Sequence, residues 1–534
     1  MSSPDLRAQP RPELSSRASG DGASTASERV SGRVTLAELE AHLWESANIL
    51  RGPIDQADFK SYIFPLLFLK RISDVYDEEF QEALDESDGD VDYASFAENH
   101  RFQVPEGAQW EDLRERTENV GQAIQQAMRA IEQANPNKLY GIFGDTQWTN
   151  KERLADSLLR DLVDHFSKLP LSNGRVAPDV LGNAYEYLIR KFADLTNKKA
   201  GEFYTPRSVV KMLVSFLNPR EGETVYDPAC GTGGMLIEVV HHVRESGGRV
   251  QLLWGKVFGQ EKNLTTAAIA RMNLFLHGVE DFDVVRGDTL RDPAFFVGDE
   301  LATFDCVIAN PPFSLKAWGQ EVWASDRFGR NFAGMPPNKS GDYAWVQHMV
   351  KSMAAKTGRL AVVLPQGALF RGGAENRIRR QLIQADLVEA VIGLAPNLFY
   401  GTPLAACVLV LRQRKAPERQ GKVLIVDASS LFKRGRNQNT LEDEHRERLE
   451  QLYTAFAEVE GSAHVADLDE IVGNDYDLKI SRYVAPVDYE QAPTLADATA
   501  QLRTALSEAH AAEDRLLELL RAEGLVDDAE VTAA

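Results

Sequence analysis

From Thr35 onward, apolar side chains recur at intervals of three and four residues, which is the spacing of a helix with one buried face. The pattern starts with Leu36, Leu39 and Leu43, becomes acidic and turn-like around residues 87–93, and then continues to about residue 170. Residues 1–32 are rich in Ser, Pro, Ala, Gly and Arg, and cannot bury enough apolar surface to offset the entropy of ordering. We therefore predict a disordered segment over residues 1–32 and an all-α domain over residues 33–170.

A different pattern begins near residue 171, where short apolar runs alternate with helical intervals. An amphipathic helix over residues 178–192 and a glycine-led turn over residues 201–207 lead into it. The strand-like runs are residues 224–226, 256–259, 283–285, 304–309, 359–364, 387–393 and 405–411. This alternation predicts an α/β domain over residues 171–415, with a doubly wound, mostly parallel sheet and helices on both faces.

The pattern loosens after residue 415, although residues 422–427 form one more strand-like run. We expect residues 416–490 to extend the α/β domain and residues 491–534 to form a long helix with a short tail. The apolar positions of that helix step alternately by three and four and form a heptad seam: Leu495, Ala498, Leu502, Ala505, Ala509, Ala512, Leu516 and Leu519. Such a seam needs a second helix, either in the core of this chain or in a partner protein.

Length and composition exclude several classes of protein. The 534 residues allow about three ordinary domains, and no apolar run approaches the roughly 20 residues of a membrane span. Since the N-terminus also lacks the pattern of a signal peptide, we expect a cytoplasmic protein without a membrane segment. The three cysteines, Cys230, Cys306 and Cys407, are too widely spaced to suggest a metal site or a disulfide framework, so no metal is expected.

The net charge of −21 limits what the chain can bind without help. A polyanion should be repelled unless basic residues are concentrated or a partner supplies them. One basic stretch, residues 433–439, interrupts the acidic chain. Such a run is usually a solvated loop, and contact with phosphate is the alternative.

A glycine-rich turn follows the first predicted strand of the α/β domain. Residues 225–236 read V-Y-D-P-A-C-G-T-G-G-M-L, which is a strand, a tight turn and the start of a helix. Glycines allow positive φ and close approach of a ligand to the backbone, but dinucleotide sites also use such turns. Asp227 at the strand tip opposes a pyrophosphate and suits a cationic ligand such as S-adenosylmethionine, which carries an ammonium and a sulfonium group.

The next two strands also end in carboxylates. Glu261 follows the second strand, where it could accept hydrogen bonds from both hydroxyls of a ribose, and Asp288 follows the third, where it could accept from an adenine amine. Asp227, Glu261, Asp288 and Asn310 thus come at the ends of four successive strands. Ligands of open α/β sheets bind outside these strand ends, so four such positions in order indicate one site.

The fourth strand runs into Asn310, Pro311, Pro312 and Phe313. Two consecutive prolines end the strand and stiffen the turn. The turn presents an amide side chain, a carbonyl and an aromatic ring, but no acid, base or nucleophile. It suits a planar group that carries an NH2, such as a nucleobase.

These motifs resemble the amino-methyltransferases of DNA, with the target-amine motif in its N-P-P-F form. The helical N-terminal region, the sequence G-E-F-Y-T-P-R at residues 201–207 and the C-terminal helix resemble the modification subunit of type I restriction-modification systems. The resemblance covers roughly residues 33–520. It implies methylation of adenine N6 in DNA with S-adenosylmethionine, a specificity subunit that recognises the DNA, a restriction subunit for cleavage, and two copies of this subunit per specificity subunit.

The resemblance also implies roles for individual residues. It places Asn310, Pro311 and Phe313 on the target base, Glu261 on the ribose of the cofactor and Asp288 near its adenine. The remaining positions would surround the methionine end of the cofactor: Glu202, Phe203, Tyr204, Thr205, Pro206, Arg207, Asp227, Gly231, Thr232, Gly233 and Gly234. Other readings remain open at this point, namely a methyltransferase of the same fold acting on RNA or on a protein glutamine, and a scaffold that binds the cofactor without catalysis.

Overall fold

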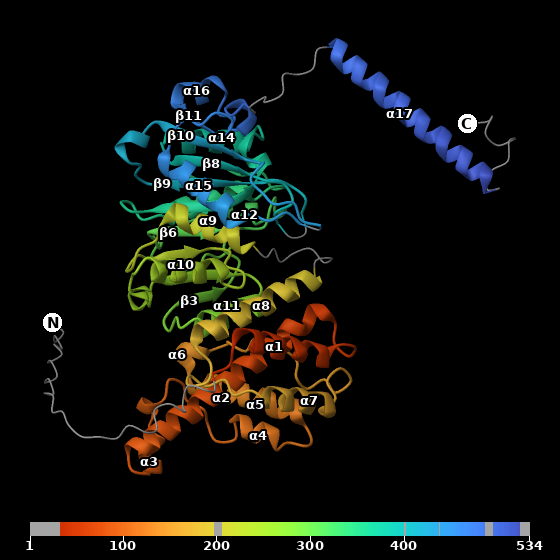
Figure 1. Ribbon diagram of the computed structural model, residues 1–534. Coiled ribbons are helices and arrows are strands. Elements are labelled where there is room, and N and C mark those ends of the chain that lie inside the picture. The colour runs from red at the N-terminus through yellow and green to blue at the C-terminus, as the bar shows by residue number, and fades with distance from the viewer. Residues whose placement is uncertain (1–32, 197–204, 400–401, 437, 486–494, 524–534) are drawn as a thin grey trace, which may run out of the picture.

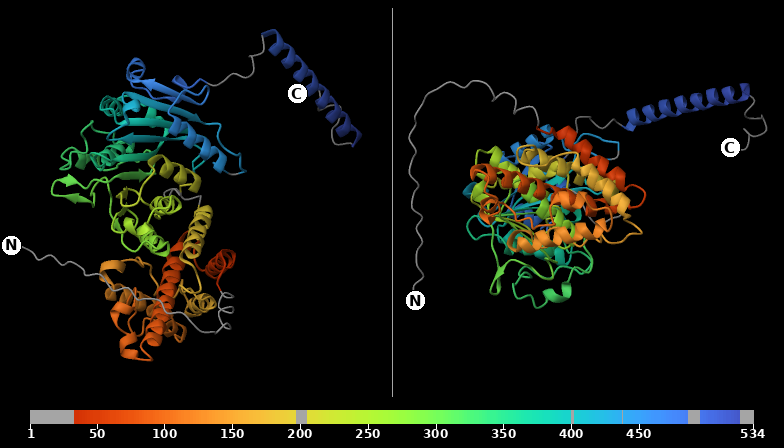
Figure 2. Two further views of the ribbon diagram at one scale, coloured as in Figure 1. Left: turned by 60° about the vertical axis from the view of Figure 1, so that its left-hand side comes forward. Right: turned by 90° about the horizontal axis from the view of Figure 1, so that it is seen from below.

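The computed structural model describes residues 33–196, 205–399, 402–436, 438–485 and 495–523. Figures 1 and 2 show a body of N-terminal helices, in red to orange, stacked on a larger body in which helices cover both faces of a sheet. The long helix α17 (Leu495–Ala522) lies apart from both bodies (Figure 1). Glu202, Phe203 and Tyr204 of the predicted site lie outside the described residues.

Over residues 33–167, the described part of the N-terminal body contains seven α-helices and two short 3-10 helices, Gln56–Asp58 and Ala97–Asn99. The α-helices are α1 (Leu36–Leu50), α2 (Phe59–Glu86), α3 (Val91–Ala94), α4 (Trp110–Arg114), α5 (Val120–Ala134), α6 (Pro136–Leu139) and α7 (Asp156–Ser167). The first helix begins at a capping box, in which the Thr35 hydroxyl accepts from the amide of Glu38 at 3.3 Å. The Glu38 carboxylate in turn accepts from the amide of Thr35 at 2.9 Å.

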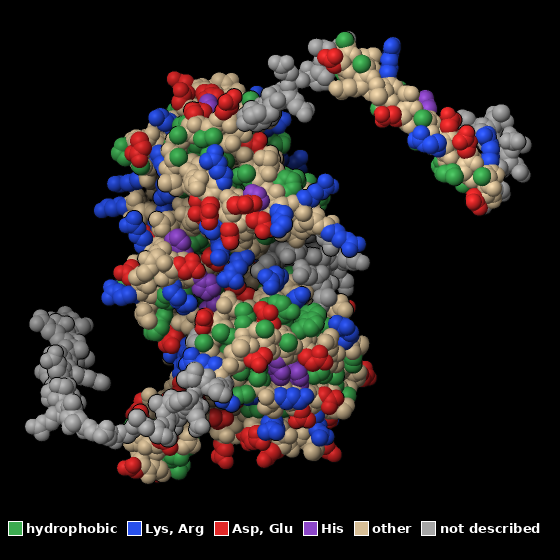
Figure 3. Space-filling model, viewed as in Figure 1, with side chains coloured by type: hydrophobic (Ala, Val, Ile, Leu, Met, Phe, Trp, Pro, Cys, Tyr) green, Lys and Arg blue, Asp and Glu red, His purple; other side chains and the backbone are tan. Residues whose placement is uncertain are grey.

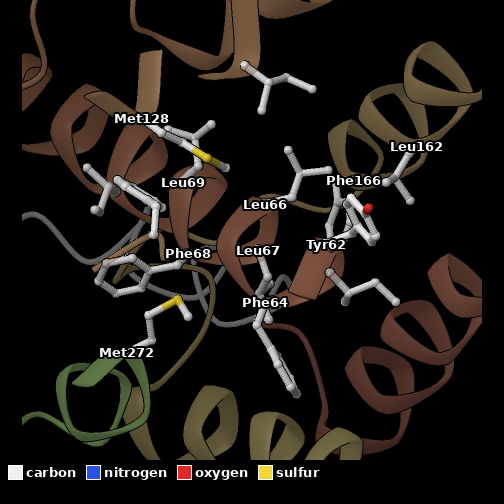
Figure 4. Close-up of a cluster of buried hydrophobic side chains, with 14 of the residues drawn as sticks. Tyr62, Phe64, Leu66, Leu67, Phe68, Leu69, Met128, Leu162, Phe166 and Met272 are labelled. Atoms are coloured by element: carbon white, nitrogen blue, oxygen red, sulfur yellow. The ribbon is translucent and has the colours of Figure 1, made fainter. Parts of the chain in front are cut away.

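Helix α2 forms the centre of this body. Residues 62–73 of α2 are buried on every side of the helix, as expected of a helix that neighbours surround completely. Figure 4 shows Phe64, Leu66 and Phe68 of α2 in a cluster with Phe166 of α7 and Met272 of a helix from the other body.

The core of the N-terminal body therefore continues into the α/β body. Two further helices, α8 (Pro178–Thr196) and α11 (Leu264–Leu276), contribute to the same cluster of buried side chains. Tyr185 and Leu188 come from α8, and Ile269 and Phe275 come from α11. Because α11 also packs on the sheet, it joins the two bodies through one continuous apolar core.

The sheet has nine strands in the order β11-β10-β8-β9-β7-β6-β1-β2-β3. Their bounds are β1 Val225–Asp227, β2 Val257–Glu261, β3 Asp283–Arg286, β6 Cys306–Ala309, β7 Arg359–Pro365, β8 Val388–Leu394, β9 Ala406–Arg412, β10 Lys422–Ala428 and β11 Ala463–Asp467. Strand β9 runs antiparallel to β7 and β8, and β11 runs antiparallel to β10, while every other pair is parallel. The predicted doubly wound, mostly parallel sheet is confirmed.

Helices cover the two faces of the sheet separately. One face is covered by α9 (Arg207–Leu217), α10 (Gly234–Glu245) and α15 (Asp443–Ala455). The other is covered by α13 (Asp342–Lys351), α14 (Ala374–Gln384) and α16 (Leu468–Gly473). Every residue of β7 and β8 is buried, which explains why both strands are mostly apolar in the sequence, apart from Arg359 and Glu389.

Some short elements give no clear signal in the sequence. The hairpin of β4 (Phe296–Val297) and β5 (Glu300–Leu301) and the helix α12 (Gln320–Trp323) are only two to four residues long. Strand β11 is partly exposed along its length, so it lacks the apolar run of the central strands. Within the described ranges, no helix is long and apolar enough to cross a membrane.

Candidate functional site

The candidate site is a pocket at the carboxyl ends of the central strands. In β1, Tyr226 pairs with Phe258 of β2 and Val307 of β6, so the ends of these three strands lie side by side. The pocket has about 580 Å³ of space, including its open mouth. Its lining includes seven of the predicted residues: Thr205, Arg207, Asp227, Gly231, Thr232, Gly234 and Asn310.

Asp227 is the most deeply buried acid of the pocket, with 2% of its surface exposed. One of its oxygens, Oδ1, accepts a hydrogen bond from the amide of Ala229 at 3.0 Å. Burial, with a smaller contribution from the negative charge of Glu261, raises the pKa of Asp227 to about 8. The pocket thus holds a carboxyl group that a nearby cation would stabilise in its charged form.

The turn between β1 and α10 depends on glycine at two positions. Gly231 and Gly233 have φ of +53° and +83°, in the left-handed region that side chains disfavour. A Cβ on Gly233 would also meet the carbonyl oxygen of Ala270 at 3.4 Å. Gly233 caps α10, and the Asn273 side chain donates to the carbonyl of Thr232 at 3.0 Å, which anchors the turn to α11.

Glu261 lies at the edge of the turn. One of its oxygens accepts from the amide of Gly231 at 3.0 Å and the other from the amide of Asn263 at 2.7 Å. These two bonds fix the orientation of the carboxylate at the edge of the pocket. Asp288 is farther out: it does not line the pocket, and it forms an ion pair with Lys262 at 2.9 Å.

Asn310 extends into the pocket from the end of β6. Its amide nitrogen, Nδ2, donates to the hydroxyl of Thr205 at 2.9 Å. This bond fixes which way the amide points and leaves its oxygen, Oδ1, as an acceptor. Pro311 is buried beside it, while Pro312 and Phe313 are partly exposed.

The aromatic ring and backbone of this turn are held from behind. Phe313 makes an edge contact with Phe399, with ring centroids 6.0 Å apart. Ser314 has a φ of +49°, and its amide donates to the carboxylate of Asp342 at 2.7 Å. Asp342 is 1% exposed and forms an ion pair with Arg371, so a buried polar network determines the position of the N-P-P-F turn.

Helix α8 supplies a pocket residue that the sequence reasoning missed. Glu186 lies on the pocket wall, where Arg207 joins it to Glu238 of α10, at 3.1 Å and 3.8 Å respectively. Burial raises the pKa of Glu238 to about 7, although Arg207 and Lys211 oppose the shift. Other missed residues line the wall without an obvious chemical role: Val210, Ala229, Cys230 and Met235.

A search for polar residues at the ends of predicted strands cannot find Glu186, because Glu186 lies in α8, which precedes the first strand of the sheet. The only signal in the sequence is a carboxylate on the amphipathic helix that precedes the G-E-F-Y-T-P-R segment. Burial raises the pKa of the Cys230 thiol well above its usual value, so the thiol in the pocket stays protonated. Among the described residues, no cluster of three or more His, Cys, Asp or Glu side chains is arranged to hold a metal ion.

The sequence matches two families of known proteins. Residues 176–492 match the family described as N-6 DNA Methylase, and residues 39–166 match the HsdM N-terminal domain. The boundary between the two matches falls just before α8, between the helical body and the segment that leads into the pocket.

Individual relatives agree with these matches. The type I restriction enzyme MjaVIII methylase subunit of Methanocaldococcus jannaschii is 33% identical over 481 residues, which are 86% of this chain and 80% of that protein. The MjaVII methylase subunit of the same organism is 35% identical over 399 residues, 72% of this chain and 66% of that protein.

Among solved structures, the type I restriction-modification methyltransferase subunit from Streptococcus thermophilus is 30% identical, with a TM-score of 0.72. The match covers 84% of this chain and 100% of that one. Because the N-6 DNA Methylase match spans more than half of the sequence and agrees with these relatives, this chain belongs to that family, as an N6-adenine DNA methyltransferase and the modification subunit of a type I restriction-modification system.

Proposed function

We propose that the chain transfers the methyl group of S-adenosylmethionine to N6 of an adenine flipped out of DNA, with Asn310, Pro311, Pro312 and Phe313 forming the acceptor side of the site. The observation that carries this proposal is that the ends of β1 and β6 meet at one pocket, while Glu261 at the end of β2 is hydrogen-bonded to Gly231 of its lining. There, the buried acid Asp227 and the amide of Asn310 line the same space.

The pocket fits the cofactor in charge and shape. Three carboxyl groups, those of Asp227, Glu186 and Glu238, line the pocket together with one guanidinium, that of Arg207, which pairs with Glu186 and Glu238. Such an environment favours a ligand with an ammonium and a sulfonium group. A Cβ added at Gly231 or Gly234 would meet no atom within 4 Å, so the turn leaves open space on this side for a ligand.

Each wall of the pocket has a proposed part in binding. Asp227 and the turn from Gly231 to Gly234 hold the methionine end, together with Thr205 and Arg207, and Glu261 accepts from the ribose hydroxyls. We extend the methionine contact to the neighbouring positions Glu202, Phe203, Tyr204 and Pro206. The weakest assignment is Asp288 to the adenine, because Lys262 already pairs with it outside the pocket.

The acceptor side orients the amine without a strong base. The Asn310 oxygen and the Pro311 carbonyl would each accept one N–H of the target amine, which directs the nitrogen lone pair toward the pocket. The bound cofactor supplies the electrophilic methyl group. The amine can release its proton after transfer, because the methylated nitrogen is acidic while it is cationic.

Phe313 would stack on the flipped base, which stabilises it by about 1–3 kcal/mol as in other contacts between bases and aromatic side chains. Extracting the base from the duplex costs a few kcal/mol. Stacking and the two amine contacts together offset this cost. The contact between Phe313 and Phe399 keeps the ring in place before the base arrives.

We further propose that the chain acts in the cytoplasm with a specificity subunit, two copies per specificity subunit, and that a restriction subunit joins for cleavage. The acidic net charge of −21 supports a division of labour, in which a partner supplies much of the DNA grip. Helix α17 supports a docking role, because Leu502, Leu516 and Leu519 of its seam are 60%, 57% and 65% exposed.

The test is methyl transfer from labelled S-adenosylmethionine to DNA, RNA and protein, with and without the specificity subunit. We expect label in DNA, at adenine N6, and far more of it when the specificity subunit is present. Label that appears only in RNA or protein would overturn the proposal.

A further inference from the structure

The basic stretch that interrupts the acidic chain is a structured loop. Residues 433–440, here called the basic loop and described except for position 437, follow β10. Its ends are paired: the amide of Lys433 donates to Thr440 at 2.9 Å, and the amide of Thr440 donates back at 3.0 Å. At Gly435 a Cβ would lie 1.9 Å from the carbonyl oxygen of Gln438, so only glycine fits this tight turn.

The basic loop is attached to the loop that follows β8. The amide and the side chain of Asn439 donate to the carbonyls of Asn397 and Pro396, each at 2.9 Å, and the Gln438 side chain donates to the carbonyl of Leu398. The next residue, Phe399, is the one that contacts Phe313. A single short segment therefore connects the basic loop to the N-P-P-F turn.

The cations of the basic loop point outward. Lys433, Arg434 and Arg436 are exposed, and Figure 1 shows the light-blue segment projecting at the right of the sheet. Figure 3 shows Lys and Arg side chains along that edge of the molecule. Lys433 lies 3.7 Å from Glu442, whereas Arg434 and Arg436 form no ion pair with any described residue.

What distinguishes these two arginines from other exposed ones is their loop, which is anchored to the segment that contacts the N-P-P-F turn. An ordinary solvated loop needs neither the fixed turn at Gly435 nor the anchoring bonds of Asn439. Arginine binds phosphate through two parallel N–H donors, and such contacts position a duplex without reading its sequence.

We propose that Arg434 and Arg436 contact the DNA backbone next to the flipped adenine, on phosphates that flank the target nucleotide. This inference rests on the proposed function, since it requires DNA as the substrate. The contacts would fix the strand on one side of the extruded base while Asn310 and Phe313 hold the base itself. They add affinity to every sequence equally, so they leave target recognition to the specificity subunit.

The test is the salt dependence of DNA binding by the complete complex with the specificity subunit. Each neutralised phosphate contributes about 0.9 to the slope of log K against log salt, so R434A/R436A should reduce that slope by about 1.8. The wild-type advantage should then grow about 12-fold between about 200 mM and about 50 mM salt. Fluorescence anisotropy of a labelled duplex measures both quantities.

The matched control removes the same charge elsewhere. Arg116, just after α4, and Arg160, in α7, are exposed, and Figure 1 shows α4 and α7 at the end of the molecule away from the sheet. R116A/R160A should therefore leave the slope close to that of the wild type. Calorimetry with S-adenosylmethionine should give equal affinities for both double variants.

An unchanged slope for R434A/R436A, or an equal loss in both variants, would overturn the inference. Failure of R434A/R436A to assemble with the specificity subunit, seen by light scattering, would instead assign the basic loop to a protein contact and also overturn it. Failure of the wild-type complex to label DNA would reject the proposed function itself, which separates the two outcomes.

Discussion

At the scale of single residues, the site depends on polar groups that the fold keeps in one orientation. Asn310 illustrates this, since its amide can turn either face to the pocket and only the bond to Thr205 selects one. Asp227 illustrates a second feature of the site. Burial disfavours its charged form and raises its pKa to about 8, so a bound cation would stabilise the carboxylate. The orientation of Asn310 and the raised pKa of Asp227 both lead to measurable predictions.

Substitution of Asn310 by Ala should lower methyl transfer by about 100-fold, the typical effect of removing a polar group that positions reacting atoms. Affinity for S-adenosylmethionine should stay near that of the wild type, because the proposed role of Asn310 is to hold the target base. Thr205→Val should reduce kcat by about 3-fold to 10-fold through loss of the orienting bond, and Thr205→Ser should restore it. Steady-state kinetics with calorimetry measures these effects, and near wild-type turnover of Asn310→Ala would remove that residue from the mechanism.

Ionisation of Asp227 should couple cofactor binding to pH. With a pKa of about 8 in the free protein, the carboxyl is protonated at pH 7, and a cationic ligand must displace that proton. Affinity for S-adenosylmethionine should therefore rise with pH by up to about tenfold per unit and level off above about pH 8. Calorimetry in buffers of different ionisation enthalpy counts the released proton.

The raised pKa of Asp227 makes the free energy of unfolding depend on pH in the opposite direction to the cofactor affinity. The unfolded chain ionises Asp227 near pH 3.8 but the folded chain only near 8, so unfolding releases a proton between these values. The contribution of Asp227 to stability should thus fall as pH rises through this window. Asp227→Asn should flatten both dependences, and an Asp227→Asn variant that keeps the wild-type pH profile of binding would contradict the assignment.

At the scale of elements, the turn between β1 and α10 has glycine at two adjacent positions, Gly233 and Gly234, for different reasons. Gly233 has a φ of +83° and faces Ala270 of α11, whereas Gly234 is the first residue of α10 and faces the pocket. The first position serves the local fold, and the second leaves room for the ligand. Substitutions can distinguish these two roles, because the adjacent glycines face different surroundings.

Substitution of Gly233 by Ala should cost about 1–2 kcal/mol of stability through left-handed strain. It should lower the melting temperature by about 1–2 °C, because the melting entropy of a unit this large is about 1 kcal/mol/K. Gly234→Ala should leave the melting temperature unchanged or slightly raised, because a Cβ there meets no protein atom within 4 Å. It should nevertheless weaken S-adenosylmethionine binding by about tenfold, since the methyl group enters the pocket. Equal effects of the two variants on melting and on binding would contradict this division.

At the scale of the whole molecule, α11 makes the helical body and the α/β body one structure. Its residues Ile269, Met272 and Phe275 lie in the core cluster of the helical body, while the other side of the helix packs on β2 and β3. Separating the bodies would expose this apolar surface to water. The two bodies should therefore unfold together.

Phe275 tests this coupling, because it is 7% exposed and contacts Phe68 and Phe102 of the helical body as well as Phe282 beside β3. Phe275→Ala should destabilise the protein by about 3–5 kcal/mol. Calorimetry should show one transition shifted to lower temperature. As a control, Phe296→Ala removes a side chain that is 42% exposed, and should change the transition little. Two independent transitions, with only one of them affected, would contradict a shared core.

Local sequence patterns allow much of the fold and part of the site to be predicted. Buried parallel strands appear in the sequence as apolar runs, and helices as apolar positions three or four residues apart. The succession of β1, β2, β3 and β6 along the chain could therefore be predicted from the sequence. Chain order then placed Asp227, Glu261 and Asn310 at one edge, because parallel strands end on the same side of a sheet. In contrast, Asp288 comes after the end of β3 but pairs with Lys262 outside the pocket.

The sequence by itself thus determined most of the helices, the central strands and their order along the chain, and the polar residues at the ends of those strands. Tertiary structure alone decided that β9 runs antiparallel between β7 and β8, that Glu186 reaches the pocket from α8, and that Asp342 supports the turn at Ser314. The physical reason is the separation along the sequence over which each kind of interaction acts. Periodicity and turn chemistry act between neighbours in the chain, whereas these three features depend on contacts between residues far apart in sequence, which only packing of the whole chain brings together.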